Sequence, residues 1–463
     1  MRRAFAAAFF VLYVAGCTTG PWHDPMGVML DREAGYSQRR AAGDQARRQI
    51  PRDPRRIEAL QKILWQRGYP FWQKRQAVDD LIAYDERAFR DALLRRFGML
   101  RNRQTIEYIF QIVSKQQWRD FTRVAVRNYE RIVHGVADKD RTERLVIQNL
   151  NPDKTLEQVV FEVFANDEDA MTYKEQVAAW QLLVRLTGHK RLIEMIKAAP
   201  AKTPLVIDMQ AGASELGVLP RHREDVLWLQ YLRDPSRRGF WDRAAAVVRR
   251  LSDEQKDDLQ LRHLPVLVQL DTTQLASSRR QLIAKIDPAL RQADRYMIGP
   301  TYDGPMRDWP QDFFHYVDRL CWGDLVTIDM LMLAVHAPAV ARKLFTQGDR
   351  DRSDPSTEYG GIIERTDEQF AARPYEPRYR KHDLKFIPSD KMIKQLYTSL
   401  AHYHFHAQRY KNRNYSGPGE GDLRLADRLG MNFLVFTFID HDRLNVDYCQ
   451  RGRIVIDLGT IRR

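Results

Sequence analysis

Cysteine is scarce in this sequence, which holds three in 463 residues: Cys17, Cys321 and Cys449. They lie far apart and form none of the closely spaced pairs that ligate structural zinc. In an oxidising compartment Cys321 and Cys449 could still pair with each other. The apolar run at residues 4–15 is shorter than the roughly 20 residues that a membrane-spanning helix needs. No serine–histidine–aspartate or cysteine–histidine pattern stands out, so a nucleophilic hydrolase is not indicated.

A block of charge of one sign is also missing. Lysine and arginine total 74 against 61 aspartate and glutamate residues, a formal net charge of +13 at pH 7. The arginines are scattered among acidic residues through segments of helical pattern, which is typical of a solvated surface. We therefore expect no nucleic-acid partner. The positive excess would favour anionic lipid headgroups or acidic wall polymers.

The N-terminus has the features of a secretory signal. Arg2 and Arg3 precede the apolar run, and small residues lead to Cys17 in the tetrapeptide Val-Ala-Gly-Cys at residues 14–17. This ending resembles the bacterial lipobox, which implies cleavage before Cys17, acylation by palmitate-like chains and a lipid anchor in the cell envelope. The residue after Cys17 is Thr18 and not aspartate. In this respect the chain resembles lipoproteins that reach the outer membrane or the periplasmic side. The alternative is an ordinary signal peptide that happens to end near a cysteine.

Two ranges with different patterns follow the signal and precede the last part of the chain. Residues 18–54 are polar and arginine-rich, which predicts a tether between the lipid and the folded body. From residue 55 to about 300 apolar residues recur with helical period, with breaks such as Tyr84-Asp85. Short amphipathic helices in succession resemble HEAT-type repeats and imply an α-solenoid-like array; an ordinary globular helical domain is the alternative. We expect helices at about residues 104–114, 117–133, 155–164, 173–187, 222–233, 236–250 and 278–293.

The residue pattern in the last part of the chain predicts an α+β domain at residues 325–463. Residues 296–322 contain two proline-bearing breaks and mark the boundary. A helix is expected over residues 324–347, interrupted near Pro338. Residues 432–439, 444–449 and 453–458 are rich in β-branched and aromatic residues and are joined by tight turns. We therefore expect a meander and an antiparallel sheet.

Three histidines alternate in Ala401-His402-Tyr403-His404-Phe405-His406, a segment typical of a β-strand. Alternation would send the three imidazoles to one face of the sheet. Two imidazoles, with a carboxylate from the glycine-rich loop at residues 417–422, can supply three protein ligands to zinc and leave a position open for water. That loop lacks the lysine and the serine or threonine of a phosphate-binding loop.

The order of these motifs resembles the JAMM (JAB/MPN) metalloprotease domain. Its early glutamate is matched by Glu358 in Glu358-Tyr359-Gly360-Gly361, its His-x-His pair by His404 and His406, and its aspartate by Asp422. The resemblance implies Zn²⁺ bound by His404, His406 and Asp422, with Glu358 as general base and His402 beside the site. Where the family carries a serine, three residues before the aspartate, this chain has Gly419, and the nearby Ser416 could take that role.

Two functions are compatible with these motifs. The first is a lipid-anchored zinc hydrolase of peptide or isopeptide bonds, whose helical region binds the protein or peptide substrate. The second is a non-catalytic envelope scaffold that keeps a degenerate JAMM-like domain. The positions of the Glu358 and Asp422 carboxylates relative to the imidazoles of His404 and His406 distinguish the two.

Overall fold

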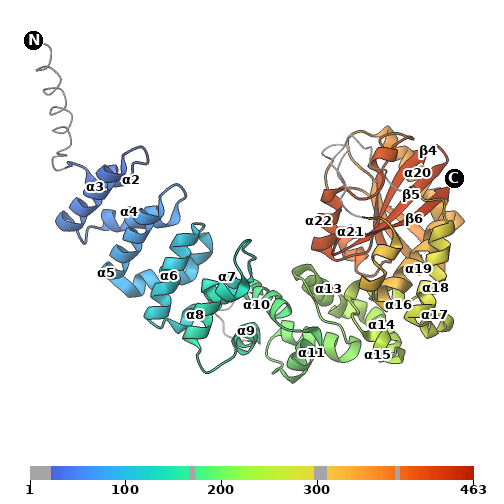
Figure 1. The fold of residues 1–463 in the computed structure, drawn as a ribbon, viewed down its shortest axis with the longest axis horizontal. Helices are drawn as coiled ribbons and strands as arrows, with labels where there is room; N and C mark the ends of the chain where they lie inside the picture. The colour runs from blue at the N-terminus through green and yellow to red at the C-terminus, as the bar shows by residue number, and fades with distance from the viewer. Residues whose placement is uncertain (1–21, 166–172, 297–309, 367, 381–385) are drawn as a thin grey trace, which may run out of the picture. The chain divides into compact units, whose positions relative to one another are not determined.

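The computed structural model in Figure 1 describes residues 22–165, 173–296, 310–366, 368–380 and 386–463. The predicted lipidation site Cys17 lies outside these residues. The chain forms two compact units, one of residues up to 164 with 174–182, the other of residues 165–173 and 183–463. The division falls inside the range 55–300 that we predicted as one array. The later helices of that range therefore belong to the same unit as the sheet.

The N-terminal unit consists of helices that pack against their neighbours along the chain. Its α-helices, with a few residues at the ends of the last two assigned to the second unit, are α2 (Pro25–Leu30), α3 (Tyr36–Gln49), α4 (Pro54–Trp65), α5 (Phe71–Arg96), α6 (Arg103–Lys115), α7 (Thr122–Glu130), α8 (Thr142–Leu150), α9 (Leu156–Ala165) and α10 (Tyr173–Leu186). The helices predicted at about 104–114, 155–164 and 173–187 are confirmed. The one predicted over 117–133 begins as a short 3-10 turn and ends at residue 130.

The break predicted at Tyr84-Asp85 is a kink inside α5. Asp85 has φ −159° and ψ 94°, outside the helical region. Its carboxylate accepts a 2.9 Å hydrogen bond from the N–H of Ala88, so it caps the second half of the helix. Apolar side chains on both sides of the kink, Leu81 and Phe89 among them, are buried.

The structure differs from the predicted tether at residues 25–49, where α2 and α3 lie. The Asp24 carboxylate accepts from the N–H of Gly27, and Pro25 occupies the first helical turn, two signals that start α2. The buried residues of α3 are Ala42, Gly43, Gln45 and Ala46, which is why no large apolar residue marks its buried face in the sequence. A hydrogen bond from Gln73 Nε2 to the carbonyl oxygen of Met29, 2.6 Å long, ties this segment to α5.

The second unit combines helices with one sheet. Its helices are α11 (His189–Ala198), α12 (Pro204–Ala211), α13 (Arg223–Arg233), α14 (Arg238–Arg250), α15 (Asp253–Lys256), α16 (Leu264–Leu267), α17 (Thr272–Ala276), α18 (Arg279–Gln292), α19 (Trp322–His336), α20 (Pro338–Ser353), α21 (Asp390–Leu396) and α22 (Glu420–Leu429). The predictions at 222–233, 236–250 and 278–293 match α13, α14 and α18. The predicted interruption at Pro338 separates α19 from α20, because proline at the first turn starts a new helix.

The sheet has six strands in the order β2-β1-β3-β4-β5-β6. The strands are β1 (Gly360–Thr366), β2 (Gln369–Tyr375), β3 (Ala401–His406), β4 (Phe433–Asp440), β5 (Arg443–Gln450) and β6 (Ile454–Arg462). The meander β4-β5-β6 is antiparallel as predicted, but β3 and β4 are parallel. The prediction of an antiparallel sheet is therefore wrong, and the sheet is mixed. The reason is α22, which carries the chain from the end of β3 back to the start of β4 and makes a β-α-β connection.

Helices cover the two faces of the sheet, and β3 divides its side chains between them (Figure 1). On one face Phe405 lies toward α20, where a side chain on Gly348 would meet the rings of Phe405 and Phe438. Tyr403, on the same face, donates a hydrogen bond from its hydroxyl to Gln347 of α20. The imidazoles of β3 occupy the opposite face, where α22 packs. The predicted alternation is confirmed.

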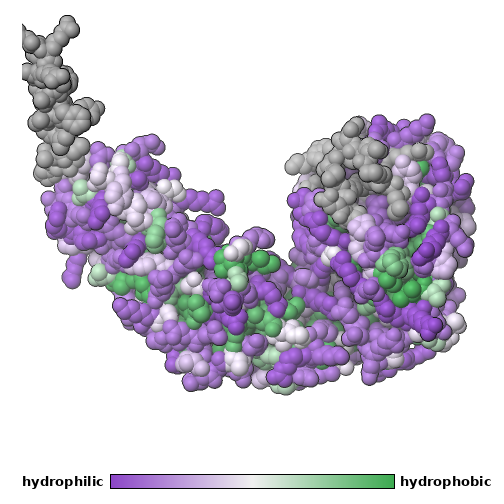
Figure 2. All heavy atoms as spheres, in the orientation of Figure 1, coloured by the Kyte–Doolittle hydropathy of each residue, from purple (hydrophilic) through white to green (hydrophobic). Residues whose placement is uncertain are grey.

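Hydrophilic side chains cover most of the face drawn in Figure 2, in keeping with the scattered charges of the sequence. In the part of the chain that the structure describes, no single helix has the length and apolar composition to cross a bilayer. The pair α19 and α20, bent by 74° at their junction, meets those two criteria only when both helices are taken together.

Candidate metal centre

The imidazoles of His404 and His406 meet the carboxylate of Asp422 on the α22 face of the sheet. His404 Nε2 lies 3.4 Å from Asp422 Oδ1, and His406 Nε2 lies 3.5 Å from Asp422 Oδ2. One ligand atom from each of the three residues lies within 4.8 Å of the others. Two imidazole nitrogens and one carboxylate oxygen at this spacing can bind a divalent metal ion.

The tautomer of His406 follows from its contact with the loop beyond β3. His406 Nδ1 lies 2.8 Å from the carbonyl oxygen of Tyr415. A carbonyl oxygen only accepts, so Nδ1 carries the proton and donates it. The lone pair of this imidazole is therefore on Nε2, the atom that faces Asp422, which is the arrangement that a metal-binding histidine needs.

Asp422 is held in place by the start of α22. Gly419 precedes the helix, and its N–H donates a 2.7 Å hydrogen bond to Asp422 Oδ2. The carboxylate thus lies at the N-terminal end of a helix, where negative charge is stabilised. Burial raises the pKa of Asp422, but the neighbouring imidazoles of His404 and His406 lower it by more, so that the pKa lies well below its usual value. Asp422 is therefore ionised and ready to bind a cation.

His404 is buried, with 2% of its surface exposed, and its Nε2 has no hydrogen-bond partner of acceptable geometry among the described residues. A buried polar atom without such a partner is costly in a folded protein. A metal ion bound through Nε2 would remove that cost. The donor set and this nitrogen therefore both fit a bound cation.

Glu358 lies two residues before β1, whose first residue, Gly360, is paired with His404 of β3. The N–H of Phe405 also bonds the carbonyl oxygen of Tyr359, so we infer that the antiparallel register continues to Glu358, opposite His406. Paired residues face the same side of a sheet, so Glu358 is on the imidazole face. It is buried, and its Oε2 accepts a 2.9 Å hydrogen bond from the N–H of Phe386.

The two glycines after Glu358 permit close packing at this point. A side chain at Gly360 would come within 2.6 Å of the carbonyl oxygen of Tyr403 and 2.9 Å of the Phe386 ring. At Gly361 it would come within 2.2 Å of the carbonyl oxygen of Arg373. Only glycine allows both approaches. The Glu-x-Gly-Gly sequence is thus explained by the packing that carries Glu358.

Ser416, the second predicted catalytic residue, is buried in the loop before α22. Its hydroxyl donates a 3.5 Å hydrogen bond to the carbonyl oxygen of Tyr296, and this contact directs it toward the end of α18. The position three residues before Asp422 is Gly419, which offers only its backbone N–H, already bound to Asp422. The structure thus brings His404, His406 and Asp422 together, binds Glu358 to the N–H of Phe386, and directs the Ser416 hydroxyl to Tyr296.

A pocket of about 580 Å³ opens beside the centre. His404 and Asp422 form part of its wall, and the rest is lined by Tyr379, Phe386, Ile387, Pro388, His402, Gly421, Arg424, Leu425 and Arg428. His402 lies at this pocket with 1% of its surface exposed and is not one of the three clustered metal-binding groups. The placement of His402 beside the site agrees with the sequence interpretation.

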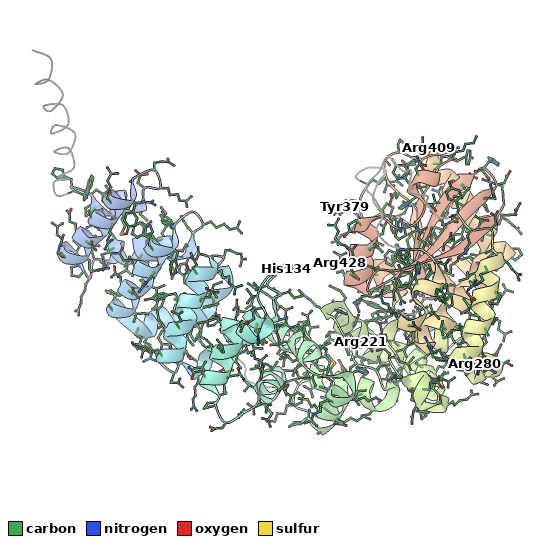
Figure 3. The ribbon with its side chains drawn as sticks, in the orientation of Figure 1. His134, Arg221, Arg280, Tyr379, Arg409 and Arg428 are labelled. Carbon is green, nitrogen blue, oxygen red and sulfur yellow. The ribbon has the colours of Figure 1, made fainter. Side chains whose placement is uncertain are left out.

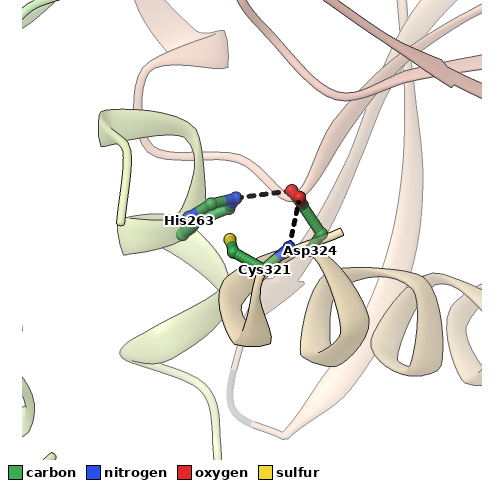
Figure 4. Close-up of side chains that lie close together, drawn as sticks. All are labelled: His263, Cys321 and Asp324. Carbon is green, nitrogen blue, oxygen red and sulfur yellow. Dashed lines mark hydrogen bonds and ion pairs between the residues drawn. The ribbon is translucent and has the colours of Figure 1, made fainter. Parts of the chain in front are cut away.

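A second cluster of metal-ligand types, which the sequence did not suggest, lies in the core of the same unit (Figure 4). His263 Nε2 lies 2.9 Å from Asp324 Oδ1, and the N–H of Cys321 donates to Asp324 Oδ2 at 3.0 Å. The other ring nitrogen of His263 accepts from the N–H of Gln260, so Nε2 carries the proton. Arg262 also binds the Asp324 carboxylate, at 2.6 Å.

Neither imidazole nitrogen of His263 is therefore available to a metal ion or to the Cys321 thiol, and an arginine already neutralises the carboxylate. Burial raises the pKa of the Cys321 thiol far above its usual value, which keeps it protonated. This cluster is a buried ion pair of the core. Cys321 and Cys449 are both free, so the pairing that the sequence left open is not formed.

Comparison with known proteins gave no relative: no family model matches the chain. No curated protein matches it significantly, and no solved structure does so.

Proposed function

We propose that His404, His406 and Asp422 bind one zinc ion, and that the second unit is a JAMM-like hydrolase of peptide or isopeptide bonds. The observation that carries the proposal is the convergence of three ligand atoms within 4.8 Å at the wall of a pocket. Three protein ligands leave zinc a position for water, as in catalytic sites. Zinc bound there would lower the pKa of that water toward neutrality and polarise a substrate carbonyl.

Glu358 supplies the proton transfer in this proposal. The register of β1 and β3, continued by two residues, would put its carboxylate opposite His406, and the hydrogen bond from the N–H of Phe386 to Oε2 supports an orientation toward the pocket. It would accept a proton from water at the centre and deliver it to the leaving amine. Since Gly419 stands in the place of the family serine, the usual hydroxyl donor to the oxyanion is replaced or missing.

The remaining parts of the proposal come from the sequence. Acylated Cys17 would anchor the protein in the envelope, on the outer-membrane or periplasmic side. The helices between residues 55 and 300 would present a protein or peptide substrate. The lipobox pattern at residues 14–17 supports the first of these statements.

Metal analysis tests the ligand assignment. We expect about one zinc per chain in the purified protein and close to none in the double variant His404→Ala/His406→Ala, because the remaining carboxylate is a weak site by itself. His441→Ala is the matched control, since His441 is exposed and pairs with Asp442. Equal zinc in the double variant and the control would refute the assignment.

A second candidate function is a binding module without catalysis. The observation that favours it is Gly419 in place of the serine, with the Ser416 hydroxyl directed to Tyr296. Loss of an oxyanion donor costs on the order of 10²–10³ in kcat where it has been measured. This candidate keeps the zinc and predicts no cleavage of any peptide.

A further inference from the structure

The pocket beside the metal centre has an uneven distribution of charge. Its single acidic lining residue is Asp422, which the two imidazoles already engage. Its other charged residues are Arg424 and Arg428, both on α22. They are four residues apart, so they lie about one turn from each other on the same side of the helix. Away from the metal ligands, the charged residues that line the pocket are therefore all cationic.

Both arginines are exposed and have no acidic partner among the described residues. Arg424 donates only to the carbonyl oxygen of Glu420, at 3.2 Å, and no hydrogen bond or ion pair links Arg428 to any described residue. Many other arginines in this unit are paired, for example Arg453 with Glu420. Figure 3 shows Arg428 and Tyr379, another lining residue, on the same side of the unit. The guanidinium groups are free to meet an anion that enters.

Most of the remaining residues that line the pocket are apolar or aromatic. Phe386, Ile387, Pro388 and Leu425 line it, and the Phe386 ring stacks on His402 with centroids 5.6 Å apart. A ligand with a short carbon chain between a polar backbone and a charged end fits such a surface. An acidic amino-acid side chain has this form.

His402 adds a buried polar group to the pocket. Only 1% of its surface is exposed, and neither of its ring nitrogens has a hydrogen-bond partner among the described residues. The two ring nitrogens of an imidazole are both hydrogen-bonding groups. A polar group that enters the pocket would therefore find a hydrogen-bond partner in His402.

We propose that this pocket is a specificity subsite that binds an acidic side chain of a peptide, next to the bond at the metal centre. The carboxylate would bind Arg424 and Arg428, the side-chain carbons would lie on Phe386 and Leu425, and His402 would hydrogen-bond the polar part of the same residue. Arginine suits the role because its planar group binds carboxylates with two parallel hydrogen bonds. The proposal rests on the zinc centre proposed above.

Peptide hydroxamates test the subsite separately from catalysis, because the hydroxamate chelates zinc and the adjacent residue samples the pocket. The probes are acetyl-Leu-Glu-hydroxamate and acetyl-Leu-Lys-hydroxamate, titrated into the zinc-loaded full-length protein at 150 mM salt. We expect the Glu probe to bind about tenfold more tightly than the Lys probe. The Glu carboxylate would form partly exposed ion pairs with the two arginines, whereas the Lys ammonium would be repelled by them. The variant Arg424→Glu/Arg428→Glu should reverse the order.

The control variant is Arg409→Glu, which reverses a charge on an exposed residue outside the pocket lining. It should keep the preference of the original protein. Equal affinity for the two probes, or the same change in the control as in the pocket variant, would overturn the subsite while the zinc centre stands. Failure of both probes to bind would instead show that the bound zinc has no open position beside the pocket, which refutes the proposed catalytic centre and the subsite with it. Zinc content and circular dichroism of each variant verify that the fold and the centre are intact.

Discussion

Glu358→Gln is expected to lower the rate of peptide cleavage by about 10²–10⁴-fold, the usual contribution of a general base, without loss of zinc. The amide oxygen of glutamine can still accept the hydrogen bond that Glu358 receives from the N–H of Phe386, so the local structure should persist. What the substitution removes is the group that accepts a proton. Cleavage of a synthetic peptide mixture that includes acidic residues, followed by mass spectrometry, measures the effect.

Glu364→Gln is the matched control for this prediction. Glu364 is in β1, the strand that follows Glu358, and its carboxylate lies 3.6 Å from the guanidinium of Arg373 in β2. We expect its cleavage rate to stay close to that of the original protein. If Glu358→Gln also cleaves at the original rate, Glu358 is not the base. If the original protein binds zinc and cleaves nothing, the binding-module candidate is favoured.

Asp324→Ala is expected to cause the largest loss of stability, about 3–5 kcal/mol in the free energy of unfolding of the second unit. The substitution leaves the Arg262 guanidinium buried without its counter-charge. It also removes the acceptor for His263 Nε2 and for the N–H of Cys321. Burial raises the pKa of Asp324, but Arg262 and His263 lower it by more, so the carboxylate is ionised in the folded protein. Chemical denaturation followed by circular dichroism measures the loss.

Two further variants separate this explanation from others. Asp287→Ala breaks an exposed pair with Arg291 and should change the free energy of unfolding by about 0.5 kcal/mol or less. The double variant Arg262→Met/Asp324→Leu removes both charges and should recover part of the loss, because an unpaired buried charge is the main cost. A loss of zinc in Asp324→Ala, with little change in stability, would show that this cluster is a metal site instead.

Several features of the fold were accessible from the sequence because they depend on neighbouring residues. Helical periodicity placed α6, α13, α14 and α18 within a few residues, and Pro338 marked the division between α19 and α20. Alternation along β3 correctly put the imidazoles on one face. The candidate site needed more, since Glu358 and Asp422 were placed only by the resemblance to the JAMM domain.

Other features depend on contacts between distant residues. The parallel pairing of β3 with β4 follows from the path of α22 over the sheet, which strand composition does not encode. The pair of Arg262 with Asp324 joins residues on η6 (Leu261–His263) and α19, and no spacing in the sequence links them. The helix α3 was missed because its buried residues are alanine, glycine and glutamine rather than large apolar residues. The strands β1 and β2 were not anticipated as a pair.

X-ray absorption at the zinc edge tests the central claim most directly, because it reports which atoms surround the metal. If zinc is bound by His404, His406 and Asp422, the spectrum will show only nitrogen and oxygen neighbours, at about 2.0–2.1 Å, with the multiple scattering of two imidazoles. The other cluster of ligand types contains the Cys321 thiol. A sulfur neighbour at about 2.3 Å, or a spectrum without imidazole, would contradict the account.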